Sequence, residues 1–566
     1  MGNQAAQEVR SVIDGASLRA GLRLVAASFV LAACQLATAD TYPVDPYVDV
    51  LHYRFDITLS DETDEISAVA TISARVAGEK TDELRLDLIG RSAARDGKGM
   101  QVHDVSSQGR ALPFTHRADS LLIELPERPP GNSTIELRIE YAGIPETGLI
   151  IADNKHGDRS FFSDNWPNKA RHWLPSVDHI SDKATSELVV VAPSRLLVVS
   201  NGLLLEQSSA GDGRRRTHWK QSVPIAPWLM VVAAAEFAVQ YVDEFDGKSI
   251  QTWVYHQDRD AGFYDFAVPT RAVLEFYSAY VGPFEYEKLA NIQANSVGGG
   301  MEAASAILYG DKSVTGQRTD RWQSVIVHEI AHQWFGNSVT EANWDDVWLS
   351  EGFATYFTSL YFEHAQGREQ FVSRMRDARD KVYEFYAEHP GYRIVHDNLD
   401  DMSEVTSLQT YQKGAWILHM LREQVGDESW WAGIRTYYGR FRNAHATTAD
   451  FRMEMEAACS CSLTAFFEQW LYQGGNIVLD GEWFYDEDGK TVEVSLSQVQ
   501  DDGQSFDAVV DVGIYDGTDP VPVIHPLSLT AAGGALSIPV PGRPAAVVLD
   551  PRTTLLARWT FAERQP

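Results

Sequence analysis

The stretch His328-Glu329-Ile330-Ala331-His332-Gln333-Trp334-Phe335 decides how the middle of the chain folds. Residues four apart lie on one face of an α-helix, so a helix here brings His328 and His332 side by side. Two imidazoles in that arrangement can hold one metal ion, and the carboxylate of Glu329 lies between them. The alternative is a pair of hydrogen-bonded structural histidines. Apolar residues flank the motif, as a buried helix requires: Val325, Ile326, Val327, Ile330, Trp334 and Phe335.

A second helical stretch supplies a third ligand. Eighteen residues separate His332 from Glu351, which lies in Trp348-Leu349-Ser350-Glu351-Gly352. A helix over 347–363 carries Glu351 toward the first helix. Two histidines and one carboxylate then leave one coordination position open to water, as a catalytic zinc site requires. We therefore predict one Zn²⁺ per chain, held by His328, His332 and Glu351. The alternative for Glu351 is a surface glutamate in the first turn of its helix.

These segments resemble the zinc signature of the M1, or gluzincin, aminopeptidases. The resemblance rests on 328–337, on Val339-Thr340 and on Trp348 to Gly352, and it extends over nearly the whole chain after the first forty residues. Arg171 to Leu188 is similar to the N-terminal domain of the family, and Val548 to Pro551 is similar to its closing β-domain. The resemblance implies a short three-domain form: a β saddle domain, a thermolysin-like catalytic domain and a small β-sandwich, without the large helical C-terminal domain of many members.

Strand-like and helix-like patterns divide the chain in the same way. Short alternating or β-branched runs, separated by Gly, Pro, Asn and Asp, occupy about 46–241. Helical periodicity dominates from about 255 to 475, and strand patterns return after that. We predict a multidomain α+β protein with an N-terminal β-domain at 40–245, a mainly helical catalytic domain at 246–475 and a C-terminal β-sandwich at 476–566.

The stretch Gly299-Gly300-Met301-Glu302-Ala303 resembles the exopeptidase motif of the family, usually written GxMEN. A fixed carboxylate is the simplest anchor for a cationic α-amine, so Glu302 is predicted to bind the free N-terminus of a peptide. Gly299, Gly300 and Met301 would let the substrate backbone approach as an added strand. The chain departs from the motif at Ala303, where Asn is usual, so the hydrogen bonds that support the loop are expected to differ. The alternative is a Gly-rich turn with an exposed glutamate.

Two further candidates come from the resemblance. The stretch Tyr411-Gln412-Lys413-Gly414-Ala415 is similar to the YxKGA helix start of the family, and the Tyr411 hydroxyl is expected to face a developing oxyanion. The alternative is a tyrosine that packs in the core or caps the helix. The family also uses a second acidic or amide side chain of the N-terminal domain to hold the amine. Asp164 is the candidate here.

Taken together, these residues predict a zinc metallopeptidase that removes N-terminal amino acids from peptides with a free N-terminus. Glu329 would be the general base for a zinc-activated water, with Tyr411 as the second catalytic residue. Two alternatives stay open. A zinc endopeptidase with the same chemistry would cleave N-acetylated peptides as well as free ones, and an inactive binding protein would retain the fold without the activity.

Composition limits the partners. The chain has 566 residues and a formal net charge of −31, so it would repel nucleic acid and anionic lipid headgroups. Its three cysteines, Cys34, Cys459 and Cys461, cannot form a disulfide framework. We expect Cys459 and Cys461 to be free, half-buried thiols. The alternative is a disulfide between them, which would close a very small, strained ring.

Residues 1–39 predict an export signal. Arg10, Arg19 and Arg23 precede an apolar run over 24–31, which is too short to span a bilayer as a permanent helix. Two processing points are open: lipidation of Cys34, as in a bacterial lipoprotein, and cleavage after Ala39. We expect an exported protein of the bacterial periplasm or cell envelope, with membrane contact only through a lipid on Cys34.

Overall fold

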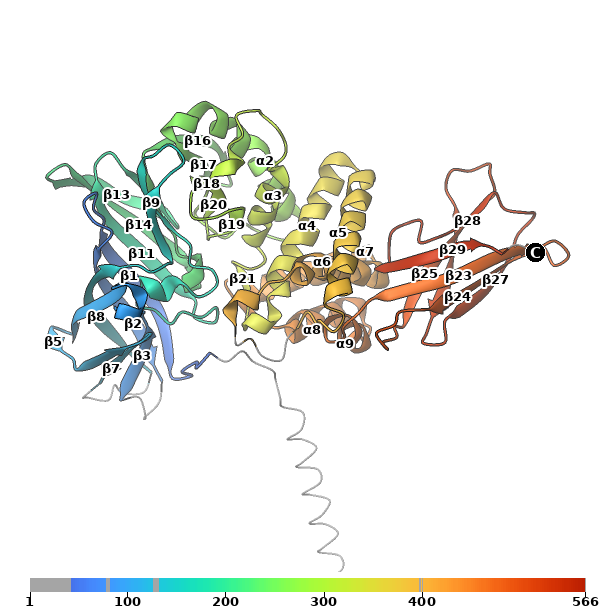
Figure 1. Cartoon of the computed structure of the whole chain (residues 1–566), viewed down its shortest axis with the longest axis horizontal. Coiled ribbons are helices and arrows are strands. Elements are labelled where there is room, and N and C mark those ends of the chain that lie inside the picture. Colours follow the sequence, from blue (N-terminus) through green and yellow to red (C-terminus); the bar gives the residue numbers. More distant parts are fainter. Residues whose placement is uncertain (1–41, 78–81, 126–131, 396–398, 400, 565–566) are drawn as a thin grey trace, which may run out of the picture.

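The computed structural model describes residues 42–77, 82–125, 132–395, 399 and 401–564. The predicted signal over 1–39, with Cys34, lies outside the described residues. Three regions follow one another along the long axis of the molecule: sheets first, then helices with one sheet, then sheets again (Figure 1). This arrangement confirms the predicted α+β class. Within the described residues, no helix is both long enough and apolar enough to cross a membrane.

An eight-stranded mixed sheet dominates the N-terminal region that the structure describes. Buried and less buried residues alternate along its central strands, because one face of the sheet packs on the core. In spatial order its strands are β13 (Leu203–Gly211), β14 (Arg214–Ile225), β11 (Ala184–Pro193), β1 (Val48–Thr58), β2 (Ile66–Val76), β8 (Ser133–Ile144), β4 (Gly99–Ser107) and β5 (Arg110–Ala111). Two smaller sheets complete the region: β12 (Leu197–Ser200), β15 (Val232–Ala235), β10 (Arg159–Ser163) and β9 (Leu149–Asp153); and β3 (Glu83–Asp87), β7 (Ser120–Glu124) and β6 (Phe114–Arg117).

A five-stranded sheet opens the middle region. Its order is β16 (Phe237–Phe245), β17 (Lys248–Tyr255), β18 (Lys288–Ala294), β20 (Ala306–Gly310) and β19 (Gly300–Met301). β17, β18 and β20 run parallel, and the short edge strand β19 pairs antiparallel with β20. The predicted boundary after residue 245 divides the β16–β17 hairpin, because β16 pairs with β17 along its length. The sequence pattern could not place this boundary, since strands stand on both sides of it.

Helices make up most of the rest of this region (Figure 1). They are α2 (Arg259–Tyr280), α3 (Gln323–His332), α4 (Trp348–Gln366), α5 (Arg368–Glu388), α6 (Leu408–Val425), α7 (Asp427–Phe441), α8 (Thr448–Cys459) and α9 (Thr464–Leu471). Two short strands, β21 (Val339–Glu341) and β22 (Ala444–Ala446), pair in parallel. α4 packs closely on α6, α3 and α5, and therefore stands at the centre of this region.

Two sheets form the C-terminal region. One contains β27 (Gly534–Pro539), β24 (Thr491–Gln498), β23 (Ile477–Asp486) and β29 (Ala557–Glu563); the other contains β26 (Val523–Leu529), β25 (Ala508–Tyr515) and β28 (Ala546–Leu549). Buried side chains of both sheets belong to the apolar core, as the predicted sandwich requires.

The expectation of two free thiols is wrong, because Cys459 and Cys461 form a disulfide. Ser460 caps the C-terminus of α8 in the left-handed conformation, with φ of 54°. This turn brings the Cα atoms of the two cysteines to 5.2 Å, within the range that a disulfide needs. A spacing of one residue in the sequence does not reveal that turn.

Candidate metal centre

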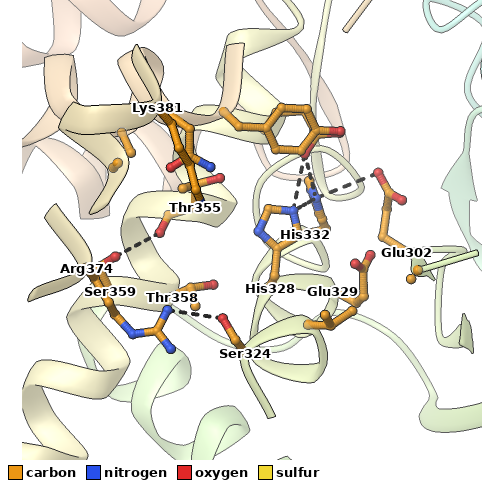
Figure 2. Close-up of a pocket in the computed structure, with 18 of the residues that line it drawn as sticks. Glu302, Ser324, His328, Glu329, His332, Thr355, Thr358, Ser359, Arg374 and Lys381 are labelled. Carbon is orange, nitrogen blue, oxygen red and sulfur yellow. Dashed lines mark hydrogen bonds and ion pairs between the residues drawn. The ribbon is translucent and has the colours of Figure 1, made fainter. Parts of the chain in front are cut away.

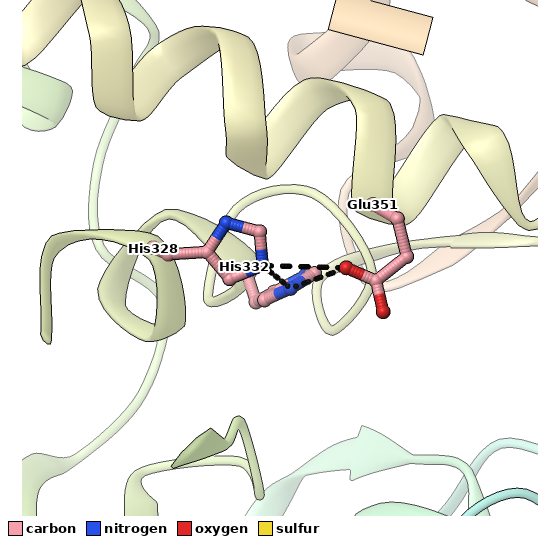
Figure 3. Close-up of side chains that lie close together, drawn as sticks. All are labelled: His328, His332 and Glu351. Atoms are coloured by element: carbon pink, nitrogen blue, oxygen red, sulfur yellow. Dashed lines mark hydrogen bonds and ion pairs between the residues drawn. The ribbon is translucent and has the colours of Figure 1, made fainter. Parts of the chain in front are cut away.

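Helix α3 and the first turn of α4 bring the three predicted metal ligands together (Figure 3). The Nε2 atoms of His328 and His332 lie 3.0 Å apart. Glu351 Oε2 lies 3.3 Å from His328 Nε2 and 3.2 Å from His332 Nε2. Three ligand atoms from two helices thus converge on one point.

The converging atoms fit a zinc ion. Bonds of about 2.0–2.1 Å to a tetrahedral zinc place neighbouring ligand atoms about 3.3 Å apart, close to the separations found here. Two imidazole nitrogens that face each other at 3.0 Å cannot both carry a proton without repulsion, so a shared cation suits them better. Two borderline-soft nitrogens and one carboxylate oxygen are also a common ligand set for catalytic zinc.

Contacts to the ring nitrogen that faces away from the metal position orient His332. Its Nδ1 lies 3.1 Å from the Phe335 carbonyl and 3.1 Å from Ser350 Oγ. A proton on Nδ1 satisfies the carbonyl and leaves the Nε2 lone pair for the metal. Gly336 has φ of 110°, and a Cβ there would lie 2.2 Å from Ser350 Oγ. Glycine is therefore required at the turn that follows α3.

The charges of the cluster favour a cation. Burial alone would lower the pKa of His332, but the carboxylates of Glu302 and Glu351 raise it to about 10. Burial would raise the pKa of Glu351, but His332 and His328 hold it well below its usual range. Because three carboxylates surround two imidazoles, the site attracts positive charge, either a proton or a metal ion.

The predicted base, Glu329, lies beside this cluster and faces the edge strand β19. It is 5% exposed. Burial, together with the carboxylates of Glu302 and Glu351, raises the pKa of Glu329 well above its usual value. Glu329 and Glu302 also approach His332 closely enough to form a second possible ligand group. The predicted base and the predicted amine anchor thus stand on the same side of the ligand cluster (Figure 2).

Glu302 follows β19, and amide side chains fix its backbone. Its carbonyl oxygen accepts hydrogen bonds from Gln333 Nε2 at 3.0 Å and from Asn337 Nδ2 at 2.6 Å. The side chain of Glu302 is buried, and its Oε1 lies 3.9 Å from His332 Nε2. Ala303, at the position where the motif has Asn, is also buried. The loop is therefore held by two amides that follow the histidine pair.

Tyr411 reaches the cluster from the first turn of α6. Its hydroxyl donates a hydrogen bond to Glu351 Oε1 at 2.7 Å. Burial and the nearby Glu351 raise the pKa of Tyr411 far above its usual value, so the hydroxyl keeps its proton. The approach depends on a close crossing of α4 and α6, where a Cβ on Gly414 would lie 2.9 Å from the Cα of Gly352.

A cavity of about 490 Å³ connects these residues. It is lined by the 299–302 loop and by Trp166 of the N-terminal region. Residues of α3, α4, α5 and α6 also line it: Ser324, Val325, Thr355, Thr358, Ser359, Arg374, Met375, Asp377, Ala378, Lys381, Gln412 and Ala415. Gly299, Gly300, Met301 and Glu302, all predicted from the sequence, line the cavity.

Asp164 does not line the cavity with these residues. Its carboxylate accepts a hydrogen bond from Lys169 Nζ at 2.8 Å, and this pairing occupies it. The cavity contact from this segment is Trp166 instead.

Several contributing residues escaped the sequence analysis. The two amides that hold the Glu302 carbonyl are Gln333 and Asn337, which the motif contains but whose role becomes visible only in the fold. Lys183, in the N-terminal region, donates to the Asn337 carbonyl at 2.9 Å and to the Ser338 carbonyl at 2.7 Å. The N-terminal sheets thereby fix the turn after α3. Because its partners are backbone carbonyls, no particular side chain elsewhere in the sequence indicates this contact.

Known protein families match both the N-terminal and the middle region of the chain. The model of the peptidase M1 N-terminal domain matches residues 50–229, and the model of the peptidase family M1 domain matches residues 264–470. Glutamyl aminopeptidase of Bos taurus is 29% identical over 463 residues, which cover 77% of this chain and 47% of that protein. A protein of Sulfurisphaera tokodaii described as probable aminopeptidase 2 is 26% identical over 401 residues, covering 67% of this chain and 49% of that protein. The chain spans about half the length of the curated relatives it matches.

A solved structure shares the fold. The M1 zinc metallopeptidase from Deinococcus radiodurans superposes with a TM-score of 0.60 at 23% identity. The match covers 73% of this chain and 90% of that one.

Proposed function

Because the chain belongs to the M1 peptidase family, we propose that it is a zinc aminopeptidase that removes the N-terminal residue of peptides. The observation that carries the proposal is the position of Glu302. Its buried carboxylate lies 3.9 Å from the Nε2 atom of the ligand His332 and lines the cavity. A cationic α-amine bound there leaves room for one residue before the scissile bond reaches the metal.

The chemistry follows from the residues around the metal. Bound by His328, His332 and Glu351, a zinc ion is a Lewis acid that polarises a carbonyl and acidifies water. Glu329 takes a proton from the attacking water and passes it to the leaving amine. The protonated Tyr411 hydroxyl is the donor that faces the developing oxyanion of the substrate. Glu302 sets the register by holding the amine.

Two alternatives remain to be excluded. An endopeptidase needs a cleft that continues past both sides of the metal, whereas Glu302 and the 299–301 loop line one end of this cavity. An inactive binding protein has no need of a base, whereas Glu329 is kept buried beside the ligand cluster. Both observations favour the aminopeptidase.

The experiment uses an alanyl peptide with a free amine, its N-acetyl derivative and a Glu329→Gln variant. The wild-type protein should release alanine from the free peptide and leave the acetylated one intact. The variant should keep one zinc per chain and lose about a hundredfold or more in kcat, since a positioned base contributes that much. Equal cleavage of both peptides would identify the endopeptidase. Absence of cleavage by the zinc-loaded wild type would identify the binding protein.

We also propose that the protein is exported to the bacterial periplasm or cell envelope. The apolar run over 24–31 supports this, as does the Cys459–Cys461 disulfide, because such bonds persist in oxidising compartments. The mass of the mature N-terminus, measured after expression of the full chain, separates lipidation at Cys34 from cleavage after Ala39. A mature protein that still begins at Met1 would contradict export by this signal.

A further inference from the structure

The cavity carries opposite charges at its two ends. Glu302 and Glu329 lie on one side of His328, and Arg374 lies on the other side (Figure 2). Arg374 and Lys381, both on α5, line the cavity together with hydroxyl groups of α4. A cavity with carboxylates at one end and cations at the other is complementary to a molecule that carries an amine and a carboxylate.

Arg374 is fixed in place but has no carboxylate of its own. Its Nη1 donates to Ser324 Oγ at 3.1 Å, and its guanidinium carbon lies 3.8 Å from the centroid of the Phe362 ring. The side chain is half-buried, and burial lowers the pKa of Arg374, although a guanidinium stays charged at neutral pH. Among the described residues, no carboxylate oxygen lies within salt-bridge distance of Arg374 or Lys381.

Some arginines of the helical region have a carboxylate partner, whereas others, such as Arg376, contact a hydroxyl group instead. Arg422 contacts Asp427 at 2.7 Å, and Arg440 contacts Glu454 at 2.5 Å. The net charge of −31 means that carboxylates outnumber cationic side chains in the chain. Among the described residues, the carboxylate that lines this end of the cavity is that of Asp377, on the exposed side of α5. Arg374, Asp377 and Lys381 together leave one excess positive charge at the wall.

The neighbouring hydroxyl groups do not supply the missing partner. Thr358 Oγ1 donates to the Ala354 carbonyl at 2.7 Å, and Ser359 Oγ donates to the Thr355 carbonyl at 3.3 Å. Their protons are used within α4. The charged donors of Arg374 and Lys381 are therefore the groups at this end that can bind an anion strongly.

The orientation of a bound peptide determines which part of it lies near Arg374 and Lys381. With the amine at Glu302 and the scissile bond at the metal, the part that leaves extends toward α4 and α5. We propose that Arg374, with Lys381 about two turns further along α5, binds a carboxylate on the leaving side of the substrate and so selects peptides that carry one there. This inference rests on the proposed aminopeptidase function. The carboxylate has two sources: the C-terminus of a dipeptide, or the side chain of an acidic second residue.

Two matched substrate pairs separate the sources. Ala-Ala and Ala-Ala-amide differ only in the terminal carboxylate, and Ala-Glu-amide and Ala-Gln-amide differ only in the side chain. The zinc-loaded wild type should show a kcat/KM about tenfold or more higher for the carboxylate member of at least one pair, as a charge-assisted hydrogen bond implies. The pair that shows the preference identifies the source.

Variants then assign the preference to Arg374. Arg374→Gln should reduce the ratio within that pair by about tenfold, mainly through KM, because binding of the carboxylate is lost. Asp377→Asn should raise the ratio, because it removes the competing negative charge. Arg376→Gln is the matched control: it removes the same charge from the same helix, but Arg376 faces Thr553 instead of the cavity and should leave the ratio unchanged.

Each outcome is decisive. Equal kcat/KM within both pairs for the wild type would overturn the inference while leaving aminopeptidase activity intact. An unchanged ratio in Arg374→Gln would overturn it too. If that variant does not fold, Lys381→Met, at an exposed position, should lower the same ratio, and an unchanged ratio there would count against the proposal. Failure to release alanine from all four substrates would instead refute the proposed function.

Discussion

The carboxylate of Glu329 lies directly against the backbone of Gly300: a Cβ at position 300 would lie 2.2 Å from Glu329 Oε1. The glycines of this loop were expected to make room for the substrate backbone. At Gly300 the structure adds a different reason, since the missing side chain makes room for the Glu329 carboxylate. The edge strand β19 and the helix α3 are thereby fixed relative to each other.

We expect Gly300→Ala to lower kcat by about a hundredfold, because displacing a catalytic group by about 1 Å costs that much. Zinc content, measured by metal analysis, should stay at one per chain, since the atoms nearest to a Cβ at position 300 belong to Glu329 and not to a zinc ligand. Gly298→Ala is the control, because a Cβ at position 298 meets nothing within 4 Å. Wild-type turnover in Gly300→Ala would show that Glu329 tolerates the displacement.

A second pair of glycines sets the spacing between the helices that carry Glu351 and Tyr411. We expect Gly414→Ala to destabilise the protein by about 1–3 kcal/mol, as overpacking of a tight contact does, and to lower kcat because α6 carries Tyr411. Gly439→Ala in α7 should instead be neutral or stabilise by about 0.5–1 kcal/mol, since its Cβ meets nothing within 4 Å and alanine favours helix. Unfolding in urea measures both, and equal effects of the two variants would contradict the account.

The metal ligands were predictable because their spacing along the sequence is typical of a zinc site. Residues four apart share a helix face, and the distance from His332 to Glu351 fits a turn and a second helix. The fold class followed from the change between alternating and helical patterns. The sequence of α7 also has the spacing of an amphipathic helix, because its buried apolar residues recur three or four positions apart. These residues are Trp430, Ile434, Tyr437 and Tyr438.

The remainder depends on contacts between distant segments. Arg374 follows His328 by 46 residues and comes to the cavity only because α5 packs on α4. The Cys459–Cys461 disulfide depends on the left-handed turn at Ser460, and the hydrogen bonds to the Glu302 carbonyl depend on how β19 lies over α3. The pairing of Asp164 with Lys169 likewise cannot be seen in the sequence pattern.

Removal of the metal should destabilise the helical region, because the carboxylates of Glu302, Glu329 and Glu351 are then left close together and buried. A ligand present at a hundred times its dissociation constant stabilises a protein by about 2.7 kcal/mol, so chelation should lower Tm by several degrees and added zinc should restore it. His332→Ala should show no change of Tm on chelation. A wild-type Tm that chelation does not alter, with loss of zinc shown by metal analysis, would contradict the prediction.

Lys413, next to Gly414 in α6, is fully buried. Its Nζ donates to Tyr386 Oη at 2.9 Å and to the Gly475 carbonyl at 3.1 Å, and so ties α6 to α5 and to the start of the C-terminal region. Burial lowers the pKa of Lys413 to about 7, although the carboxylate of Asp502 acts in the opposite direction.

This pKa predicts a pH dependence of stability. A lysine in the unfolded chain keeps its proton up to about pH 10.4, so between pH 7 and 9 unfolding takes up a proton at Lys413. Raising the pH in that window therefore opposes unfolding and stabilises the wild type relative to Lys413→Met by about 1.4 kcal/mol per pH unit, whereas below pH 7 the difference should be constant. Lys183 and Lys288, whose pKa values burial also lowers to about 7, are present in both proteins and cancel. Urea unfolding at pH 6, 7, 8 and 9 measures the difference. If it does not change with pH, the hydroxyl and the carbonyl hold Lys413 in its charged form inside the protein.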